Sequence, residues 1–437
     1  MVTVEGLQLQ AGTRLLHIGP HKTGTTAVQG AFHLARSQLA ACGVVYAGPD
    51  RQPLLPALAV TGRPPLLGGP IPVMASWTEL VREVREAEDQ RVVVSSEFFA
   101  DADEAAARRI VEDLGGSRVH VVVTLRPLSK LLPSQWQQYL QNGLRVPYVE
   151  WLEGILAQPA STPTPNFWYR HAHDRLIARW AAIVGPQNLT AIVVDESDRS
   201  ALLRSFEALL GLPDGILVPE DGIVNRSLTL GETELVRLLN EEFKRRGWTA
   251  GHYSKFMRYG AVEQLKVRMP VAGEQRVATP AWALERASQI GAAMAANIAS
   301  AGVRIVGDLT TLGRPAPDER QLAADAADLV VPVEAAVQAV LGAFMIGGVA
   351  GQTVSASREI AARVLLADLA QRGWERARRS LPWARGGEQP ASSGGQDPRS
   401  LLDREASAPA IPGAHGRPAI PAQSAPTIES VPDQARR

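Results

Sequence analysis

The stretch RLLHIGPHKTGTT, residues 14–26, carries the strongest fold signal in the sequence. Its first five residues are typical of a buried strand, and a helical pattern runs from Thr25 to about Ala41. Between the two, glycines let the backbone curl so that consecutive N–H groups point at one anion. The helix N-terminus and Lys22 add positive charge there. The stretch therefore predicts a phosphate-binding loop between a strand and a helix.

Three further apolar runs predict strands of the same sheet. They cover residues 92–96, 119–125 and 189–194, and helical patterns such as 77–87 separate them. Continuous apolar strands that alternate with helices imply a parallel sheet covered on both faces. The predicted fold class is therefore α/β, with ligands bound beyond the carboxyl ends of the strands.

The second half of the chain is predicted to be mainly helical. The longest apolar stretch, around residues 329–351, carries Glu334 and several glycines, so we interpret it as a buried helix rather than a membrane span. From about Gly386 the chain is rich in Pro, Ala, Ser, Gly and Gln, and we predict disorder because few large apolar groups are present. The helical patterns cover 200–210, 229–246, 281–301, 333–344 and 355–380.

Composition narrows the class of protein. The 437 residues include 45 basic and 45 acidic side chains, so a general nucleic-acid or membrane-surface binder is disfavoured, because both need a cationic excess. Cys42 is the single cysteine, which leaves no intramolecular disulfide and no thiolate metal cluster. No basic segment followed by an apolar run opens the sequence, and we expect a cytoplasmic protein. Oligomeric state is not predicted.

A second cationic position follows the valine-rich strand 119–125. Arg126 comes at the end of this strand, and Ser134 lies eight residues later in a predicted helix. Arginine offers phosphate oxygens a planar fork of donors, and a hydroxyl adds a neutral hydrogen bond. The sequence thus favours two phosphate anchors at the sheet edge, although a surface ion pair remains an alternative for Arg126.

The loop differs from the nucleotide triphosphate loop of ATPases. The spacing Gly19-x4-Gly24 matches the start of that loop, but a lysine must then follow, and this chain has Thr25 there. We also find no convincing acidic partner for Mg²⁺ at the end of a later strand. A P-loop kinase or nucleotide hydrolase stays open as one alternative. A non-catalytic nucleotide-binding scaffold stays open as another.

The segment KTGTT, residues 22–26, resembles the 5′-phosphosulfate loop of the bacterial sulfotransferases that use PAPS (3′-phosphoadenosine-5′-phosphosulfate). Arg126 and Ser134 resemble the 3′-phosphate site of that family. Segments 193–196, 209–213 and 224–228 match it more loosely, so the resemblance covers roughly residues 12–245. The binding residues that it implies are Lys22, Thr23, Gly24, Thr25, Thr26, Arg126 and Ser134.

The resemblance implies a P-loop NTPase-like sulfotransferase fold with three parts. Residues 12–250 would form the PAPS-binding α/β domain, and 251–384 a helical extension that is a possible acceptor lid. Residues 385–437 would be the disordered tail. The activity implied is transfer of a sulfuryl group from PAPS to a hydroxyl acceptor, such as a carbohydrate or glycolipid, giving PAP with no metal required. In the extension, Lys255 and Arg258 are candidate ligand-binding cations, with a solvated helix face as the alternative.

The catalytic roles follow from sulfuryl transfer as an in-line displacement. Lys22 would neutralise charge on the leaving 5′-phosphate oxygen, as similar groups do in phosphoryl transfer. Glu97, just past strand 92–96, is the predicted general base, with a structural ion pair as its alternative role. His171 and His173 are the rival bases. At i and i+2 on one predicted helix they would point different ways, which argues against a metal pair.

Overall fold

The computed structural model describes residues 6–65, 70–156, 163–198, 200–220, 226–314 and 331–347. The chain divides into one compact unit up to Val354 and a second from Ser355 to Arg437. The second unit lies outside the described residues. The predicted helix 355–380 and the predicted disordered tail 385–437 therefore stay predictions.

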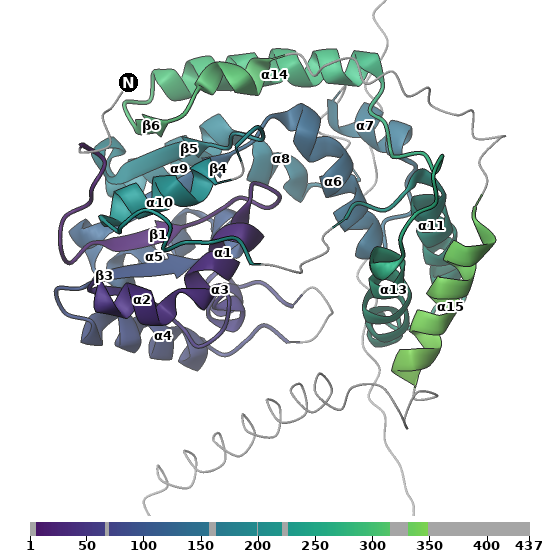
Figure 1. The fold of residues 1–437 in the computed structure, drawn as a ribbon, viewed down its shortest axis with the longest axis horizontal. Coiled ribbons are helices and arrows are strands. Elements are labelled where there is room, and N and C mark those ends of the chain that lie inside the picture. The colour runs from purple at the N-terminus through teal and green to yellow at the C-terminus, as the bar shows by residue number, and fades with distance from the viewer. Residues whose placement is uncertain are drawn as a thin grey trace, which may run out of the picture. The chain divides into compact units, whose positions relative to one another are not determined.

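The described part of the first unit is built on a sheet of six parallel strands (Figure 1). The strand order is β2-β3-β1-β4-β5-β6, so the strand that leads into the phosphate loop lies near the centre between β3 and β4. The predicted α/β fold with a parallel central sheet is confirmed, and β2 and β6 are strands that the sequence analysis missed. The strands are β1 Arg14–His17, β2 Val44–Tyr46, β3 Arg91–Ser95, β4 Val119–Leu125, β5 Leu189–Val193 and β6 Arg304–Val306.

Helices cover both faces of the sheet because neighbouring strand residues point to opposite sides. Leu15 of β1 belongs to one hydrophobic cluster and Leu16 to the other. Burial of each large aliphatic side chain in these clusters stabilises the fold by roughly 2 kcal/mol. One face packs against α1 Thr25–Leu34, α2 Arg36–Ala41 and α10 Ala201–Leu210. The other packs against α3 Leu54–Val60, α4 Met74–Glu86, α5 Glu104–Leu114 and α9 His173–Val184.

A third hydrophobic cluster, the helical core, is built mainly from helices, which lie to the right of the sheet in Figure 1. Helix α14, Ala281–Ala299, contributes to both cores, with Ile298 in the sheet core and Met294 in the helical core. Residues beyond 250 therefore support the sheet as well as the extension. The helical core contains α6 Leu128–Gln141, α7 Tyr148–Leu156, α8 Asn166–His171, α11 Leu230–Arg245, the π-helix η6 Tyr253–Ala261, α13 Val262–Val267 and α15 Val333–Gly347, and α12 Ala250–His252 leads into η6.

Two helix predictions need correction. The predicted helix 25–41 is divided at Ala35, where ψ of 7° ends α1 before α2 begins. The interpretation of the apolar stretch 329–351 as a buried helix is wrong for its described part, α15. Val340 is 53% exposed and Phe344 is 55% exposed, because α15 packs with only one face against the helical core. Among the described helices, none is long and apolar enough to cross a membrane.

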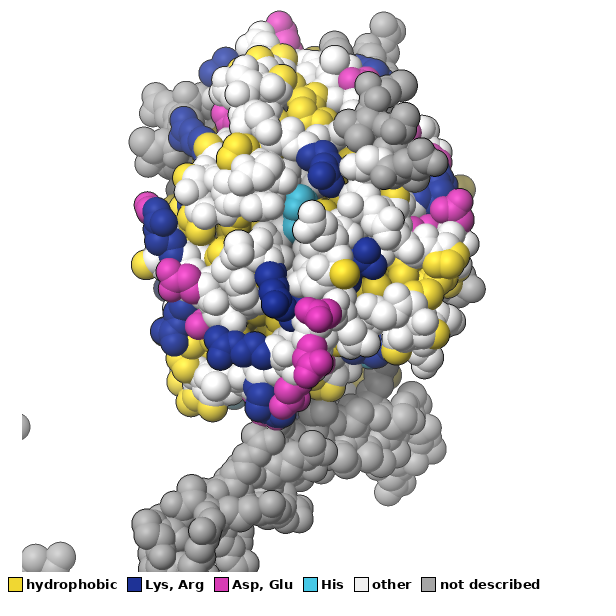
Figure 2. Space-filling view, turned by 90° about the vertical axis from the view of Figure 1, so that its left-hand side faces the viewer, with side chains coloured by type: hydrophobic (Ala, Val, Ile, Leu, Met, Phe, Trp, Pro, Cys, Tyr) yellow, Lys and Arg dark blue, Asp and Glu magenta, His cyan; other side chains and the backbone are white. Residues whose placement is uncertain are grey.

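Figure 2 views the molecule from the side on which the strands begin, where hydrophobic, charged and uncharged side chains are mixed. A cavity of about 580 Å³ there is lined by residues that precede or begin strands, including Thr13, His120, Asn188 and Arg304. Lys and Arg side chains are interspersed with Asp and Glu on this face, and a histidine side chain is visible in a hollow. The His120 ring lies 2.8 Å from the Thr190 hydroxyl, and burial lowers its pKa to about 4. The predicted site residues lie at the opposite, carboxyl edge of the sheet.

Candidate functional site

The loop between β1 and α1 is fixed to the end of the neighbouring strand β4. The Thr124 N–H donates to the Gly19 carbonyl oxygen at 2.8 Å. The Thr124 hydroxyl lies 3.2 Å from the same oxygen and 2.6 Å from the Thr23 hydroxyl, which also donates to Pro20 O at 2.6 Å. The Thr23 side chain is thus engaged in holding the loop. Its backbone N–H is the group that is left for a ligand.

Two residues in the left-handed region give this loop its curl. Lys22 has φ of 66° and Gly24 has φ of 93°. A Cβ on Gly24 would lie 2.7 Å from Cδ2 of Leu202, so both conformation and space require glycine here. For Lys22 the conformation costs about 1 kcal/mol. Helix α1 starts immediately afterwards, and the N–H groups of Thr25 and Thr26 have no carbonyl one turn back to bond. This arrangement suits an anion.

Lys22 lies in a strongly cationic environment. Burial, together with the positive charge of Lys266, lowers the pKa of the Lys22 ammonium from 10.5 to about 8. The Glu97 carboxylate acts in the opposite direction, and Arg126 and Arg258 add smaller repulsions. An anion beside Lys22 would favour its charged form against burial and these repulsions. The charges at this edge of the sheet therefore fit a phosphate-bearing ligand.

Arg126 lies beside Lys22, as the strand order requires. Its Nη1 donates to the Lys22 carbonyl oxygen at 3.3 Å, and its Nε donates to Glu196 Oε1 at 2.5 Å. Because Glu196 follows β5, this ion pair ties the carboxyl ends of β4 and β5 together. The Arg126 side chain remains 27% exposed. The two predicted anchors are thus adjacent, and the arginine keeps donors on the solvent side.

Ser134 lies on α6 and is half-buried. Its hydroxyl donates to the Leu131 carbonyl oxygen at 3.0 Å, one turn back in the same helix. No hydrogen bond joins Ser134 to Arg126 within the described residues. The hydroxyl would have to rotate away from its own helix to donate to a phosphate held by Arg126. Its predicted role in binding stays a prediction.

Glu97 lies on the other side of β1, where β3 ends and the short helix η2 (Glu97–Asp101) begins. Its Oε2 accepts a hydrogen bond from Gln29 Nε2 at 3.0 Å. A Cβ on Gly19 would lie 3.0 Å from the Glu97 Cβ, so the base of the Glu97 side chain is closely packed against the phosphate loop. It is half-buried and near enough to raise the pKa of Lys22. The predicted base and the predicted cation therefore share one site.

His171 and His173 do not share a helix, contrary to our prediction. His171 ends α8, Ala172 has ψ of 80°, and His173 begins α9. Their ring centroids are 6.3 Å apart, and both side chains are fully buried. Burial lowers the pKa of His171 well below its ordinary value and that of His173 to about 4. Over the ranges that the structure describes, no group of three or more His, Cys, Asp or Glu side chains could hold a metal.

A set of buried and half-buried polar side chains lies at the loop and beside it, and the sequence analysis did not identify it. We call His21, Gln135, Tyr139, Arg170 and His171 the polar cluster. Burial lowers the pKa of His21 well below its ordinary value, and the charge of Arg170, then His171 and Lys22, acts in the same direction. Burial raises the pKa of Tyr139, opposed by Arg170 and by Gln135. These mutual effects place the members close together.

Several polar atoms of the polar cluster are buried without a hydrogen bond. His21 Nε2, Gln135 Oε1, the Tyr139 hydroxyl and both His171 nitrogens are buried without a hydrogen bond among the described residues. Arg170 is the exception, because its Nε and Nη2 each donate to a carboxylate oxygen of Asp101 at 2.6 Å. Buried polar groups without partners usually meet ordered water or a ligand. A signal for the cluster existed in the i, i+4 spacing of Gln135 and Tyr139 just after Ser134.

The helical extension also brings cations to the loop. Arg258 of η6 donates from Nη1 to Asn142 Oδ1, and both Arg258 and Lys266 of α13 lower the pKa of Lys22. Lys266 was not predicted. Lys255, by contrast, is exposed, with its ammonium 5.4 Å from the Phe256 ring centroid. Of the two predicted cations of the extension, only Arg258 is thus seen to influence the loop.

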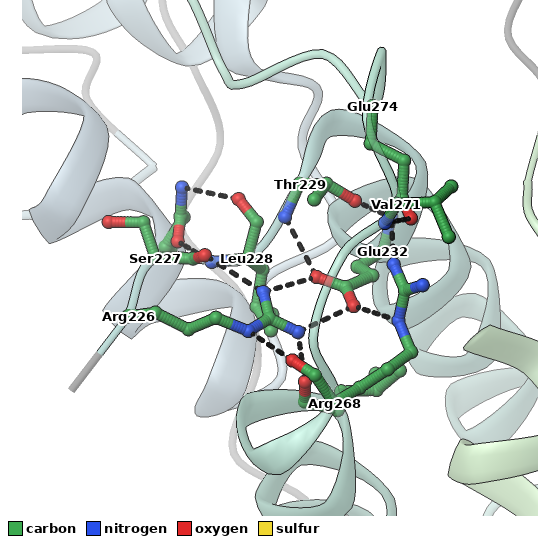
Figure 3. Close-up of polar contacts among 10 residues, drawn as sticks. Arg226, Ser227, Leu228, Thr229, Glu232, Arg268, Val271 and Glu274 are labelled. Carbon is green, nitrogen blue, oxygen red and sulfur yellow. Dashed lines mark hydrogen bonds and ion pairs between the residues drawn. The ribbon is translucent and has the colours of Figure 1, made fainter. Parts of the chain in front are cut away.

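An ion-pair network fixes the end of α13 that carries Lys266 (Figure 3). At its centre is Glu232, which is fully buried. Arg226 donates to both Glu232 oxygens, at 2.8 and 2.7 Å, and Arg268 Nε donates to Oε1 at 2.8 Å. Arg226 also donates to the carbonyl oxygen of Leu265, the neighbour of Lys266. The Thr229 N–H donates to Glu232 Oε2 at 2.8 Å, which completes a capping box at the start of α11.

The fold and the site together are those of a phosphate-binding α/β protein. A parallel α/β sheet with a curled loop, a helix N-terminus and several cations at the carboxyl ends of its strands is a typical arrangement for binding phosphate groups. No family model and no curated protein matches the chain. Among solved structures it is similar to a sulfotransferase from Alicyclobacillus acidocaldarius, at 14% sequence identity and a TM-score of 0.35. The match covers 54% of this chain and 96% of that one.

Proposed function

We propose that this chain is a sulfotransferase that moves a sulfuryl group from PAPS to a hydroxyl acceptor. The observation that carries the proposal is the hydrogen bond of 3.3 Å from Arg126 Nη1 to the Lys22 carbonyl oxygen. It brings the cation at the end of β4 next to the cation of the loop after β1. Two adjacent anchors suit a nucleotide with phosphate groups at two positions, which distinguishes PAPS from ATP.

The donors at the site fit this nucleotide. Lys22 and the N–H groups of residues 23–26 would hold the 5′-phosphosulfate, and Arg126 would hold the 3′-phosphate with its free donors. Glu196 neutralises part of Arg126 in the ligand-free protein. A bound phosphate would compete with that carboxylate for the guanidinium. Lys266 adds positive charge on the side of the extension.

The side chains also suit the chemistry of transfer. The acceptor oxygen attacks sulfur while the bond from sulfur to the 5′-phosphate oxygen breaks. Lys22 stabilises the negative charge that develops on this leaving oxygen. Glu97 accepts the proton of the attacking hydroxyl. The products are a sulfate ester of the acceptor, PAP and a protonated Glu97, which returns its proton to solvent.

Nucleotide binding can be tested by thermal unfolding of the full chain with PAP, with ADP, and with ATP plus Mg²⁺. We expect PAP to raise the unfolding midpoint most, because ADP and ATP lack the 3′-phosphate. Stabilisation of about 2.7 kcal/mol corresponds to ligand at a hundredfold excess over its Kd. If ATP with Mg²⁺ alone raises the midpoint, the chain is a P-loop kinase or hydrolase and the proposal is wrong.

The 3′ anchor is tested by Arg126→Met. We expect PAP affinity to fall by about tenfold to a hundredfold, as for loss of a charge-assisted hydrogen bond, while AMP affinity changes little. The matched control is Arg118→Met at the opposite edge of the sheet, where the side chain is 53% exposed. It should bind PAP like the unaltered chain. Equal losses for PAP and AMP in the Arg126 variant would exclude Arg126 from a 3′-phosphate site.

Catalysis is separated from binding by Glu97→Gln. We expect normal PAP binding and a fall of about 10²- to 10⁴-fold in transfer of labelled sulfate from PAPS to pooled carbohydrate and lipid acceptors. A chain that binds PAP but shows no transfer in either form would be a nucleotide-binding scaffold.

A further inference from the structure

An apolar cavity of about 490 Å³, partly open to solvent, lies in the helical core between α11, η6 and α15. Phe243, Met257 and Ala339 are at most 9% exposed and form its floor, while Trp248 and Val340 are about half exposed at its margin. The volume falls within the range of small-molecule pockets, which are concave and mostly apolar. The buried floor makes it a pit rather than a flat surface for another protein.

The lining dictates the chemistry of an occupant. All three elements contribute hydrocarbon or aromatic side chains, and His252 is the lone titratable residue among the described lining residues. A charged or strongly polar group placed there would lose its hydration without gaining partners. An uncharged alkyl chain loses nothing and gains burial of each methylene.

The cavity has a fixed wall. Helix α15 packs against η6 through Gly260 and Gly342 at backbone contact. A Cβ on Gly260 would lie 2.8 Å from Gly342 O, and one on Gly342 would lie 2.3 Å from Gly260 O. So close a crossing sets the spacing of the two helices beside the cavity.

The other side of η6 faces α6, the helix that follows Arg126, because Arg258 Nη1 donates to Asn142 Oδ1 at the end of α6. Met257 of η6 lines the cavity, and its neighbour Arg258 acts on the charge of Lys22. Met257 is thus one residue away from a side chain that belongs to the cationic site. A single molecule with a polar head and an alkyl chain can therefore engage both sides of η6.

We propose that this cavity binds the alkyl chain of the acceptor, which makes the acceptor an amphiphile with a hydroxyl-bearing head group. The inference rests on the proposed sulfuryl transfer and deepens it by naming the substrate class. The chain lies in the cavity, and the head group reaches Glu97 and the loop. A second copy of this chain, or residues 348–437 of the same chain, are the other occupants that an experiment must distinguish.

Binding is tested by calorimetric titration of the full chain with hexyl, octyl and decyl glucoside, each below its micelle concentration. We expect saturable binding of one molecule per chain. Affinity should rise about fourfold for each added methylene, until the cavity is filled. Absence of saturable binding would overturn the proposal and would indicate that the cavity is filled by another part of the chain.

Location is tested by Ala336→Phe, which adds a ring to a half-buried lining position of α15, with Val340→Trp at the margin as a second variant. We expect decyl glucoside affinity to fall at least tenfold. The matched control, Val337→Phe, adds a ring to an exposed position of the same helix outside the lining and should bind normally. Equal affinity in all variants would overturn the proposal. So would a dimer of the unaltered chain that Ala336→Phe dissociates in light scattering.

The activity arm separates this inference from the proposed function. With PAPS present, decyl glucoside should be sulfated at a lower KM than hexyl glucoside, and Ala336→Phe should abolish the difference while PAP affinity is unchanged. Failure of PAP to bind would refute the proposed function while leaving chain binding measurable. Normal PAP binding and transfer without any chain-length effect would refute the alkyl site alone.

Discussion

The phosphate loop and the polar cluster meet at the same edge of the sheet, yet they differ in how far their polar side chains are hydrogen-bonded. In the loop, the hydroxyls of Thr23 and Thr124 and the carbonyl of Gly19 bond to one another. In the polar cluster, His21, Gln135, Tyr139 and His171 bury polar atoms without partners among the described residues. These threonine hydroxyls of the loop are paired as the chain folds, whereas the cluster carries an unmet capacity for hydrogen bonds.

The difference teaches where a ligand can gain binding energy. A buried polar atom without a partner costs about 1–3 kcal/mol, and a ligand that supplies the partner recovers part of that cost. The Thr23 hydroxyl offers no such gain because it is already paired, so the loop contributes mainly through the charge of Lys22 and through backbone N–H groups. The predictions that follow test these two modes, from the largest expected effect to the smallest.

The charge of the loop is tested by Lys22→Met. Transfer activity should fall about 10³-fold, because the charge opposite the leaving oxygen is lost. Stability of the ligand-free chain should rise, because a buried cation among like charges is removed. Steady-state kinetics with labelled PAPS and urea unfolding measure the two effects. A fall in activity below tenfold would mean that Lys22 does not face the reacting group.

The internal bonds of the loop are tested by Thr124→Val, which keeps the shape and removes the hydroxyl. We expect a loss of about 2 kcal/mol in the free energy of unfolding, since the Thr23 hydroxyl and the Gly19 carbonyl lose a buried partner. Urea unfolding provides the measurement. A loss under about 0.5 kcal/mol would show that the loop is not held in this way.

The pH dependence of PAP binding tests the charge of Lys22 from another side. Lys22 has a pKa of about 8 in the ligand-free fold, and a bound phosphate favours its charged form. PAP affinity should therefore fall as pH rises above 8, by at most about tenfold per unit. Binding near pH 8 should take up protons, which calorimetry in buffers of different ionisation enthalpy measures. Affinity that is constant from pH 7 to 10 would contradict the assignment.

The lowered pKa of Lys22 also affects folding stability: PAP affinity should fall as pH rises, whereas the stability of the ligand-free protein should increase. The pKa of Lys22 is lower in the folded chain than its ordinary value of 10.5. Between about pH 8 and 10.5 the unfolded chain thus binds more protons at this residue. Lys22 should therefore make the ligand-free protein more stable as pH rises through this window. The Lys22→Met chain should lack this component in urea unfolding at a series of pH values.

The polar cluster is tested by Tyr139→Phe, the smallest effect of the series. Because the Tyr139 hydroxyl is buried without a hydrogen bond in the described part of the chain, its removal relieves a cost, and we expect stability to rise by up to about 1 kcal/mol. The matched control is Tyr148→Phe, which removes a hydroxyl 2.7 Å from that of Thr279 and should lose about 1 kcal/mol. Equal losses in the two variants would contradict the difference between satisfied and unsatisfied groups.

The local sequence was sufficient to predict the central strands of the sheet and the loop that follows β1. The strand 119–125 is a continuous apolar run, and β4 covers these same residues. The loop after β1 combines glycine, lysine and a helix start within ten residues, so its curl was predictable. β2 and β6 were missed because three residues each, VVY and RIV, are too short to establish a period.

The rest of the site depends on contacts that no local pattern encodes. Lys266 comes close to Lys22 from about 240 residues away in the sequence, because the network around Glu232 holds α13 in place. The polar cluster combines residues from the loop, α6 and α8. The error over His171 and His173 had a simpler origin, since the break at Ala172 has no proline or glycine to announce it.

The position of β6 has a consequence during synthesis. About 110 residues lie between the end of β5 and the start of β6. Because the ribosome needs roughly ten seconds to synthesise them, β5 remains an unpaired edge strand of the nascent sheet for that time. During that interval the nascent sheet presents unpaired backbone groups, which can recruit strands of other chains. Slower translation between these strands, or a weakened α14, should therefore appear first as aggregation of newly made protein.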